Sequence, residues 1–191
     1  TYENVEGARN DNPESYTVES VKITLLEPSK TGYTFGGWYT DDTYTIPVTE
    51  IAAGSVGDVT LYAKWTVNQY TVSWNANGGT LDGGNASVSA EYGSPVSAVK
   101  PADPTREPTD EFTYTFLGWF TDVACTHPRE DGAIVPENGM TLYAKWTETA
   151  RKYTITWVSE GADNKTTELV YGAWLDMNTP SDIQRDAEEG Y

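Results

Sequence analysis

Residues 60–65 read TLYAKW, and residues 141–146 read TLYAKW again. A second motif precedes each copy: residues 31–40 read TGYTFGGWYT, and residues 113–121 read TYTFLGWFT. The separation is 81 residues both from Trp38 to Trp119 and from Trp65 to Trp146. Because self-similarity at a fixed period is the sequence signature of repeat proteins, we predict tandem copies of one small module.

The repeat also indicates where each module begins and ends. The opening motif YTVSW at residues 70–74 returns as YTITW at residues 153–157. We predict module 1 at residues 1–66, with a truncated first strand, module 2 at 70–147, which is complete, and a partial module 3 at 153–191. Module 3 is expected to lack two strands, and a piece of this size rarely buries a core by itself.

Alternating segments indicate β-structure. Tyr70, Val72 and Trp74 alternate with polar residues, which is the period of a strand with one buried face. Seven Trp, 13 Tyr, 17 Gly and 10 Pro are typical of small β-domains with many turns. One helical turn is expected at residues 49–54, and the Pro-rich residues 95–108 are expected to be extended. The predicted fold is mostly β, with at most one short helix in each module.

Charge and composition argue against several classes of partner. The formal net charge of −17 disfavours nucleic acid and anionic membranes, since both need clustered Lys and Arg. No run of about 18 apolar residues is present, so we expect no membrane insertion. Any signal peptide or anchor is expected to lie outside this piece. Cys125 is the single cysteine, which excludes an internal disulfide.

The motifs YTVSWNANGGT, TGYTFGGWYTD and TLYAKW resemble the Listeria–Bacteroides repeat, which is related to the B repeat of internalin B. The resemblance covers nearly the whole chain. It implies a small β-grasp-like (ubiquitin- or SUMO-like) module. It also implies an extracellular location in secreted or wall-attached bacterial proteins. The family has no common catalytic residues, so the resemblance implies neither an active site nor a cofactor.

Cys125 and His127 are the one thiol and imidazole that lie close in the sequence. On a strand these positions share a face, so a Cys–His pair is conceivable. At the 81-residue offset they match Tyr44 and Ile46, which are ordinary packing residues. We therefore predict no catalytic or metal site at this position.

Calcium binding is a second alternative that the sequence leaves open. Asp41 and Asp42 could hold a calcium ion at a joint between modules, because carboxylate oxygens are its preferred ligands. Module 2 keeps the first carboxylate as Asp122 and replaces the second with Val123. We predict that neither pair is a metal site.

Four aromatic residues are predicted to be exposed contact residues: Trp174, Tyr44, Phe112 and Tyr114. Trp174 matches Pro95 in the repeat, so the fold does not require an aromatic ring there. Docking between adjacent modules is expected to be a commoner role for these residues than ligand binding. Module 2 also carries five extra residues near Glu107–Glu111, which we expect to form a surface loop.

Every strong signal in the chain repeats, and repeated residues serve the fold. We therefore expect a non-catalytic extracellular segment of a larger bacterial surface or secreted protein, which acts as a spacer, a presentation stalk or a protein-binding accessory module. Its partners would be neighbouring repeat modules. The alternative is an adhesin module that binds a host protein or glycan beside a secreted enzyme. An enzyme would need a convergent polar cluster in a deep pocket.

Overall fold

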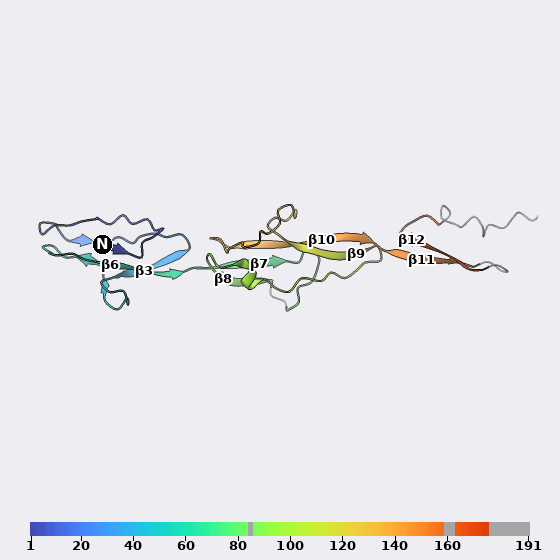
Figure 1. The fold of residues 1–191 in the computed structure, drawn as a ribbon, viewed down its shortest axis with the longest axis horizontal. Helices are drawn as coiled ribbons and strands as arrows, with labels where there is room; N and C mark the ends of the chain where they lie inside the picture. The colour runs from blue at the N-terminus through green and yellow to red at the C-terminus, as the bar shows by residue number, and fades with distance from the viewer. Residues whose placement is uncertain (84–85, 159–162, 176–191) are drawn as a thin grey trace, which may run out of the picture. The chain divides into compact units, whose positions relative to one another are not determined.

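A computed structural model describes residues 1–83, 86–158 and 163–175 (Figure 1). The described residues form short β-strands and a single 3₁₀ helix, η1 (Val96–Val99). The predicted mostly-β chain with little helix is confirmed for this part. Residues 159–162 and 176–191 of the predicted module 3 lie outside the described residues.

The chain divides into two compact units, each assembled from segments that are distant in sequence. The first contains the described residues among 1–74, 85–101 and 129–142. The second contains the described residues among 75–84, 102–128 and 143–191. The boundaries of the three repeat modules stay a prediction.

The first sheet has the strand order β1-β6-β3-β4, with β1 (Tyr2–Glu3), β6 (Leu61–Val67), β3 (Tyr33–Tyr39) and β4 (Pro47–Val48). β1 runs parallel to β6, and β3 runs antiparallel to both of its neighbours. The register shifts between Phe35 and Trp38, where Gly37 has a φ of 117°. This is the β-bulge that the Gly-Gly pair inside a strand indicates.

A two-stranded sheet lies beside it, made of β2 (Ile23–Thr24) and β5 (Glu50–Ile51). The helical turn predicted at residues 49–54 is therefore wrong. Glu50 and Ile51 pair with Thr24 and Ile23, so pairing with a distant segment overrides the weak cap signal of Thr49. The one helix that is described, η1, lies instead inside the Pro-rich stretch that we expected to be extended.

The second four-stranded sheet has the order β8-β7-β10-β9, with β8 (Ser87–Glu91), β7 (Gln69–Asn75), β10 (Met140–Ala150) and β9 (Phe112–Phe120). β9 and β10 are antiparallel, and their register shifts between Lys145 and Trp146. The extra residue of this second bulge is Leu117 of β9, which is next to Gly118, and Gly118 has a φ of 132°. A final antiparallel pair, β11 (Lys152–Trp157) and β12 (Lys165–Val170), carries the opening motif of module 3.

The recurring aromatic rings build matching cores in modules 1 and 2. Phe35 lies 5.4 Å from both the Trp38 ring and the Trp65 ring. Phe116 lies 5.5 Å from Trp119 and 5.6 Å from the corresponding second Trp of module 2, which is Trp146. Three of the recurring tryptophans are buried: Trp38, Trp74 and Trp119. The other three are half-buried: Trp65, Trp146 and Trp157. Rings at the repeat period therefore form the core.

Candidate functional site at the module joints

Asp41 closes the loop that follows β3. Its carboxylate accepts hydrogen bonds from the backbone N–H of Thr45 (3.0 Å) and of Ile46 (2.7 Å), and from the Thr45 hydroxyl (2.7 Å). A hydrogen bond from the Thr43 hydroxyl, followed by these bonds, holds the pKa of Asp41 well below its usual range. Because donors of its own loop contact both oxygens, Asp41 acts as a loop anchor.

Asp122 closes the loop that follows β9 in module 2, in the same way as Asp41 in module 1. It accepts from the backbone N–H of His127 (2.7 Å) and of Thr126 (3.0 Å), and from the Thr126 hydroxyl (2.9 Å). Desolvation raises the pKa of Asp122, but the hydrogen bonds from His127 and Thr126 outweigh it and lower the pKa to about 2. The residue at the same loop position has a positive φ in both modules, 54° at Tyr44 and 52° at Cys125. The two loops therefore share a backbone shape although their sequences differ.

The side chains of Cys125 and His127 lie in different environments. Cys125 is buried, and its Sγ lies 3.7 Å from the carbonyl oxygen of Ala144. The His127 side chain is 79% exposed, and its Nδ1 lies 3.3 Å from an Asp122 oxygen. No group of three or more His, Cys, Asp or Glu residues in the described part of the chain is placed to hold a metal ion.

The low pKa of Asp122 predicts that acid destabilises the folded conformation of its loop. The folded-state pKa lies below the ordinary value of 3.8, so the ionised carboxylate stabilises the folded state above about pH 4. That contribution is lost as the pH falls toward about 2. We expect Asp122→Asn to lower the thermal midpoint at pH 7 and to flatten its dependence on pH between about 4 and 2, followed by circular dichroism. Asp131→Asn, which removes an exposed partner of Arg129, is the control. An equal pH dependence in both variants would contradict the assignment.

Two of the predicted contact residues take part in contacts within their own modules. The Tyr44 ring lies 5.5 Å from the Tyr39 ring, and its hydroxyl accepts a hydrogen bond from Asn4 (2.8 Å). The Tyr114 ring lies under the Arg106 guanidinium, 3.7 Å from its carbon. Tyr114 lies 81 residues after Tyr33, which carries the Lys30 ammonium at 4.8 Å, so the repeat preserves this cation–π contact.

A single residue joins β6 to β7, and its backbone forms the first joint. Asn68 N–H donates to the carbonyl oxygen of Gly32 (2.9 Å), and its own carbonyl oxygen accepts from Tyr92 N–H (2.8 Å). The Tyr92 ring lies 6.1 Å from Tyr33 and 6.3 Å from Tyr70. A Cβ at Gly32 would lie 2.0 Å from the Tyr92 ring, so the close contact requires glycine. Residues of modules 1 and 2 thus meet around the Asn68 backbone.

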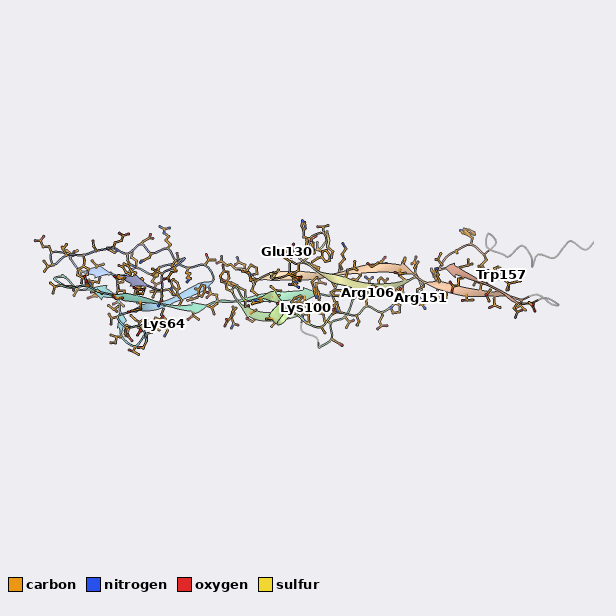
Figure 2. The ribbon with its side chains drawn as sticks, in the orientation of Figure 1. Lys64, Lys100, Arg106, Glu130, Arg151 and Trp157 are labelled. Carbon is orange, nitrogen blue, oxygen red and sulfur yellow. The ribbon has the colours of Figure 1, made fainter. Side chains whose placement is uncertain are left out.

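The second joint repeats this bonding pattern. Arg151 is the single residue between β10 and β11 (Figure 2), and its N–H donates to the carbonyl oxygen of Glu111 (2.8 Å). The Arg151 carbonyl oxygen accepts from Tyr171 N–H (3.0 Å). The Tyr153 ring lies 6.4 Å from the Tyr171 ring, compared with 6.3 Å between the Tyr70 and Tyr92 rings in the first joint. The second joint therefore holds residues of modules 2 and 3 by the same pair of backbone bonds.

The five-residue insertion of module 2 provides the backbone carbonyl groups that accept hydrogen bonds at the second joint. Its residues 107–111 are exposed, as predicted for a surface loop. Arg151 Nη1 donates to the carbonyl oxygen of Thr109 (2.8 Å), and the Tyr153 hydroxyl donates to that of Asp110 (2.7 Å). Phe112, the third predicted contact residue, begins β9 here and pairs with Ala150. The insertion lengthens the antiparallel pair of β9 and β10, and the second joint lies at the end of this longer pair.

Trp174 follows the turn at Tyr171–Gly172 and is 74% exposed. Tyr171 and Leu175 are also exposed beside it in the sequence. Of the four predicted contact residues, Trp174 is the one with a largely exposed side chain, whereas Tyr44, Phe112 and Tyr114 are half-buried. Phe112 and Tyr114 are two residues apart on β9 and so share one face of that strand, whereas Tyr44 lies in the loop after β3 of module 1.

Sequence reasoning missed the hydrogen bonds of the joints because their acceptors are backbone carbonyl groups. A usable signal was nevertheless present. The dipeptide Tyr-Gly at residues 92–93 recurs at 171–172, and each copy follows an opening strand that begins with Tyr70 or Tyr153. Paired tyrosines at fixed positions around a one-residue connection indicate rings that meet there.

The sequence profile of the Listeria-Bacteroides repeat domain matches residues 1–64 and 70–145. The chain belongs to this repeat family. The two matched ranges end just before the first joint and near the end of the TLYAKW motif in β10. No solved structure matches the chain significantly.

Three known proteins are similar in sequence to part of this chain. A protein of Evansella cellulosilytica named "Putative membrane protein" is 39% identical over 122 residues, which is 63% of this chain and 17% of that protein. A second protein of that organism is 34% identical over 137 residues, 71% of this chain and 14% of its length. Internalin H of Listeria monocytogenes is 32% identical over 127 residues, 63% of this chain and 20% of its length. The chain thus spans a fifth or less of these relatives. No helix among its described residues is long and apolar enough to cross a bilayer.

Proposed function

We propose that this chain is a non-catalytic repeat segment of a larger bacterial surface or secreted protein, and that it spaces or presents the other parts of that protein. The observation that carries the proposal is the recurrence of one joint. The same two backbone hydrogen bonds surround Asn68 and Arg151. A chain built to hold successive modules at fixed positions needs such a joint at every boundary, and it needs no reactive site.

The chemistry of the described residues supports the non-catalytic role. The anionic loop residues Asp41 and Asp122 are occupied by donors of their own loops, and the only cysteine faces a core carbonyl group. The recurring aromatic residues pack into cores. In each module the β-grasp-like fold that the sequence motifs suggest is part of the proposal.

An extracellular location, in a secreted or cell-surface-attached protein, is proposed from the relatives. One is named as a membrane protein and another as an internalin. The net charge of −17 fits a solvated surface that keeps a repetitive protein soluble. The partners that we propose are the neighbouring repeat modules of the same chain.

Tyr92→Ala tests the spacer function at the first joint. Removing this ring deletes two aromatic contacts, each worth about 0.5–1.5 kcal/mol, and leaves the Trp38 core in place. We expect small-angle scattering of the wild type to fit an extended particle, and that of the variant to fit a wider range of particle dimensions. Tyr39→Ala, which removes a tyrosine pair away from the joint, is the matched control. A compact wild-type particle would argue against a spacer.

The exposed Trp174 favours a second candidate function, an adhesin module that binds a host protein or glycan. A large exposed aromatic ring is the type of residue that dominates binding interfaces. The test is binding of the wild type and of Trp174→Ala to a panel of host extracellular proteins and glycans. Binding that the substitution weakens tenfold or more would support this candidate, and binding that it leaves unchanged would remove Trp174 from consideration.

A further inference from the structure

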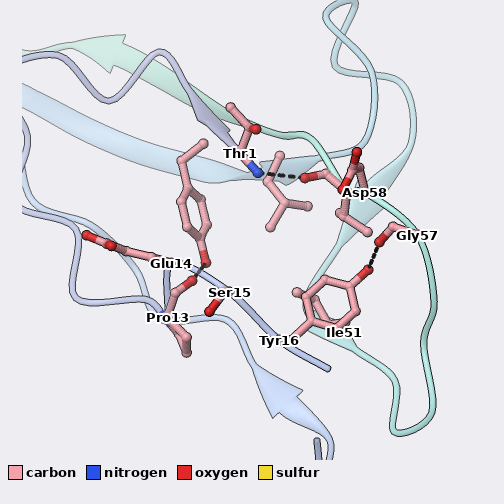
Figure 3. Close-up of a pocket in the computed structure, with 11 residues that line it drawn as sticks. Thr1, Pro13, Glu14, Ser15, Tyr16, Ile51, Gly57 and Asp58 are labelled. Atoms are coloured by element: carbon pink, nitrogen blue, oxygen red, sulfur yellow. Dashed lines mark hydrogen bonds between the residues drawn. The ribbon is translucent and has the colours of Figure 1, made fainter. Parts of the chain in front are cut away.

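A cleft of about 260 Å³ lies at the start of β1 in module 1. Figure 3 shows that residues of its wall are bonded to the module itself. The Tyr16 hydroxyl donates to the carbonyl oxygen of Gly57 (2.6 Å), and the Tyr2 hydroxyl donates to that of Pro13 (2.8 Å). These hydroxyl groups hold the loops of module 1 in place. We find backbone groups that can bind a partner elsewhere, on strand β9 of module 2.

β9 is an edge strand of its sheet (Figure 1). It pairs with β10 along one side, Pro128 forms a single bridge with Phe120 near its end, and no other described strand pairs with its second side. Proteins normally protect such an edge with charged residues or proline. Residues 112–117 read FTYTFL and contain neither. This edge therefore lacks the usual protection against pairing with another chain.

The hydrogen bonds of β9 alternate between its two sides, as in any antiparallel pair. Arg151 N–H donates to the carbonyl oxygen of Glu111 (2.8 Å), so Thr113 and Thr115 are the next positions that bond to β10. The backbone N–H and carbonyl oxygen of Tyr114, which lies between them, therefore point to the open side of β9.

Phe112 confirms this direction at the start of the strand. Its N–H donates to the Thr109 hydroxyl (3.0 Å), and its carbonyl oxygen accepts from Thr109 N–H (2.9 Å), both on the side away from β10. By the same alternation, the backbone N–H and carbonyl oxygen of Phe116 point to the open side. The open edge thus begins after the turn at Thr109 and continues to the bulge at Leu117.

The sequence of this open edge is a palindrome. Residues 112–116 read FTYTF in both directions. When two copies of the strand pair antiparallel about a two-fold axis at Tyr114, Phe112 lies opposite Phe116 of the second copy, and Thr113 lies opposite Thr115. Every cross-strand pair then joins side chains of the same type. Aromatic pairs and threonine pairs are favourable combinations on a sheet.

We propose that β9 is a self-association strand, which pairs antiparallel with β9 of a second copy of this chain. The two Tyr114 backbones exchange hydrogen bonds at the two-fold axis, and Phe116 N–H donates to the Phe112 carbonyl oxygen of the second copy. That carbonyl oxygen keeps its bond from Thr109, because a carbonyl oxygen has two lone pairs. The two sheets become one continuous sheet. This association goes beyond the spacer function, because it joins two spacers to each other.

Module 1 does not offer the same edge. The residues that match FTYTF at the 81-residue offset are residues 31–35, which read TGYTF and are not a palindrome. Gly32 also belongs to the first joint, where its carbonyl oxygen accepts from Asn68 N–H (2.9 Å). Self-association is therefore a property of module 2, whose extra residues near 107–111 come directly before the palindrome.

The charged groups near Tyr114 permit this approach. The Arg106 guanidinium carbon lies 3.7 Å from the centre of the Tyr114 ring, and the Glu148 carboxylate lies 4.0 Å from the same guanidinium group. The two-fold axis therefore brings together two ion pairs rather than two isolated cations. The net charge of −17 on each copy opposes association. Salt screens this repulsion, with a Debye length of about 8 Å at about 0.15 M, which is the ionic strength for the test.

Thr113 and Thr115 allow a test that leaves the packing of module 2 intact, because both side chains are exposed. Thr113→Lys combined with Thr115→Lys places a lysine opposite a lysine of the second copy on both sides of the axis. Like charges directly opposite each other oppose strand pairing. We expect sedimentation of the full chain to show a reversible dimer between micromolar and millimolar concentrations. We expect the dissociation constant of this variant to be at least tenfold higher.

Two further variants test the register and the location of the contact. Thr113→Lys combined with Thr115→Glu places opposite charges in the same cross-strand pairs, so it should associate at least as tightly as the wild type. Thr147→Lys combined with Thr149→Lys places two lysines on β10, directly beside the same two threonines but away from the edge. This control should leave the dissociation constant unchanged. Circular dichroism checks that each variant is folded.

Amide hydrogen exchange locates the contact independently. When the dimer forms, exchange at Tyr114 and Phe116 should slow at least tenfold, because their N–H groups gain acceptors. Exchange at Thr113 and Thr115, which already bond to β10, should stay the same.

A chain that stays monomeric at millimolar concentration would overturn the proposal. A dimer that the two lysine pairs weaken equally would also overturn it, as would one that the lysine–glutamate pair fails to restore. Unchanged exchange at Tyr114 and Phe116 on dimer formation would place the contact elsewhere and reject β9 as the self-association strand. None of these results bears on the spacer function, which is tested at the first joint with Tyr92→Ala.

Discussion

Replacing Trp38 with Ala is expected to destabilise module 1 by about 3–5 kcal/mol. The ring is 3% exposed and lies 5.2 Å from Tyr2 and 5.4 Å from Phe35. Its indole donates to the carbonyl oxygen of Leu26 (2.9 Å), so the substitution also leaves that acceptor without this donor. The loss combines a large cavity with a broken hydrogen bond. Urea unfolding monitored by hydrogen exchange in β3 and β6 would measure it.

Trp174→Ala is the matched control, because it makes the same chemical change at a side chain that is 74% exposed. We expect it to change the free energy of unfolding by less than about 0.5 kcal/mol. Equal effects of the two substitutions would mean that the recurring tryptophans are not core residues. That result would remove the basis for treating the repeats as packed modules.

The second large effect is expected for Gly139→Ala. Gly139 has a φ of 74°, in the left-handed region, and a Cβ there would lie 2.2 Å from the carbonyl oxygen of Thr71. The backbone strain costs about 1–2 kcal/mol, and the forced displacement of β7 adds about 1–3 kcal/mol. Thermal unfolding, with hydrogen exchange of β7, would measure the sum.

Gly93→Ala separates these two contributions. Gly93 has the same φ of 74°, but a Cβ added there would meet no atom within 4 Å beyond its chain neighbours. We expect it to lose only the backbone contribution of about 1–2 kcal/mol. If Gly139→Ala were no more damaging than Gly93→Ala, the close approach of Thr71 to Gly139 would have no energetic importance.

The periodic aromatic residues made much of the fold predictable. Strands β3, β6, β9 and β10 contain the motifs at the 81-residue spacing, and the register shifts of both pairs lie beside a glycine within these motifs, Gly37 or Gly118. These features depend on side-chain type and local spacing. Both are directly visible in a sequence.

The features that escaped prediction depend on distant pairing. Thr49–Gly54 offers a helix cap and a stop signal, yet Ile51 forms a strand because Ile23 is available to pair with it. The hydrogen bonds of the joints could not be predicted for a related reason. Arg151 bonds to carbonyl oxygens of Thr109 and Glu111, and a carbonyl group is present at every residue whatever its side chain. The insertion could be located from the sequence, but not its acceptor role.

The one-residue connections have a mechanical consequence. β6 ends at Val67 and β7 begins at Gln69, so tension passes from module 1 into module 2 without a slack tether to absorb it. In module 1 the first strand, β1, and the last strand, β6, are parallel neighbours. A pull on the two ends of that module loads their hydrogen bonds in shear, and the bonds must then rupture together rather than unzip one at a time.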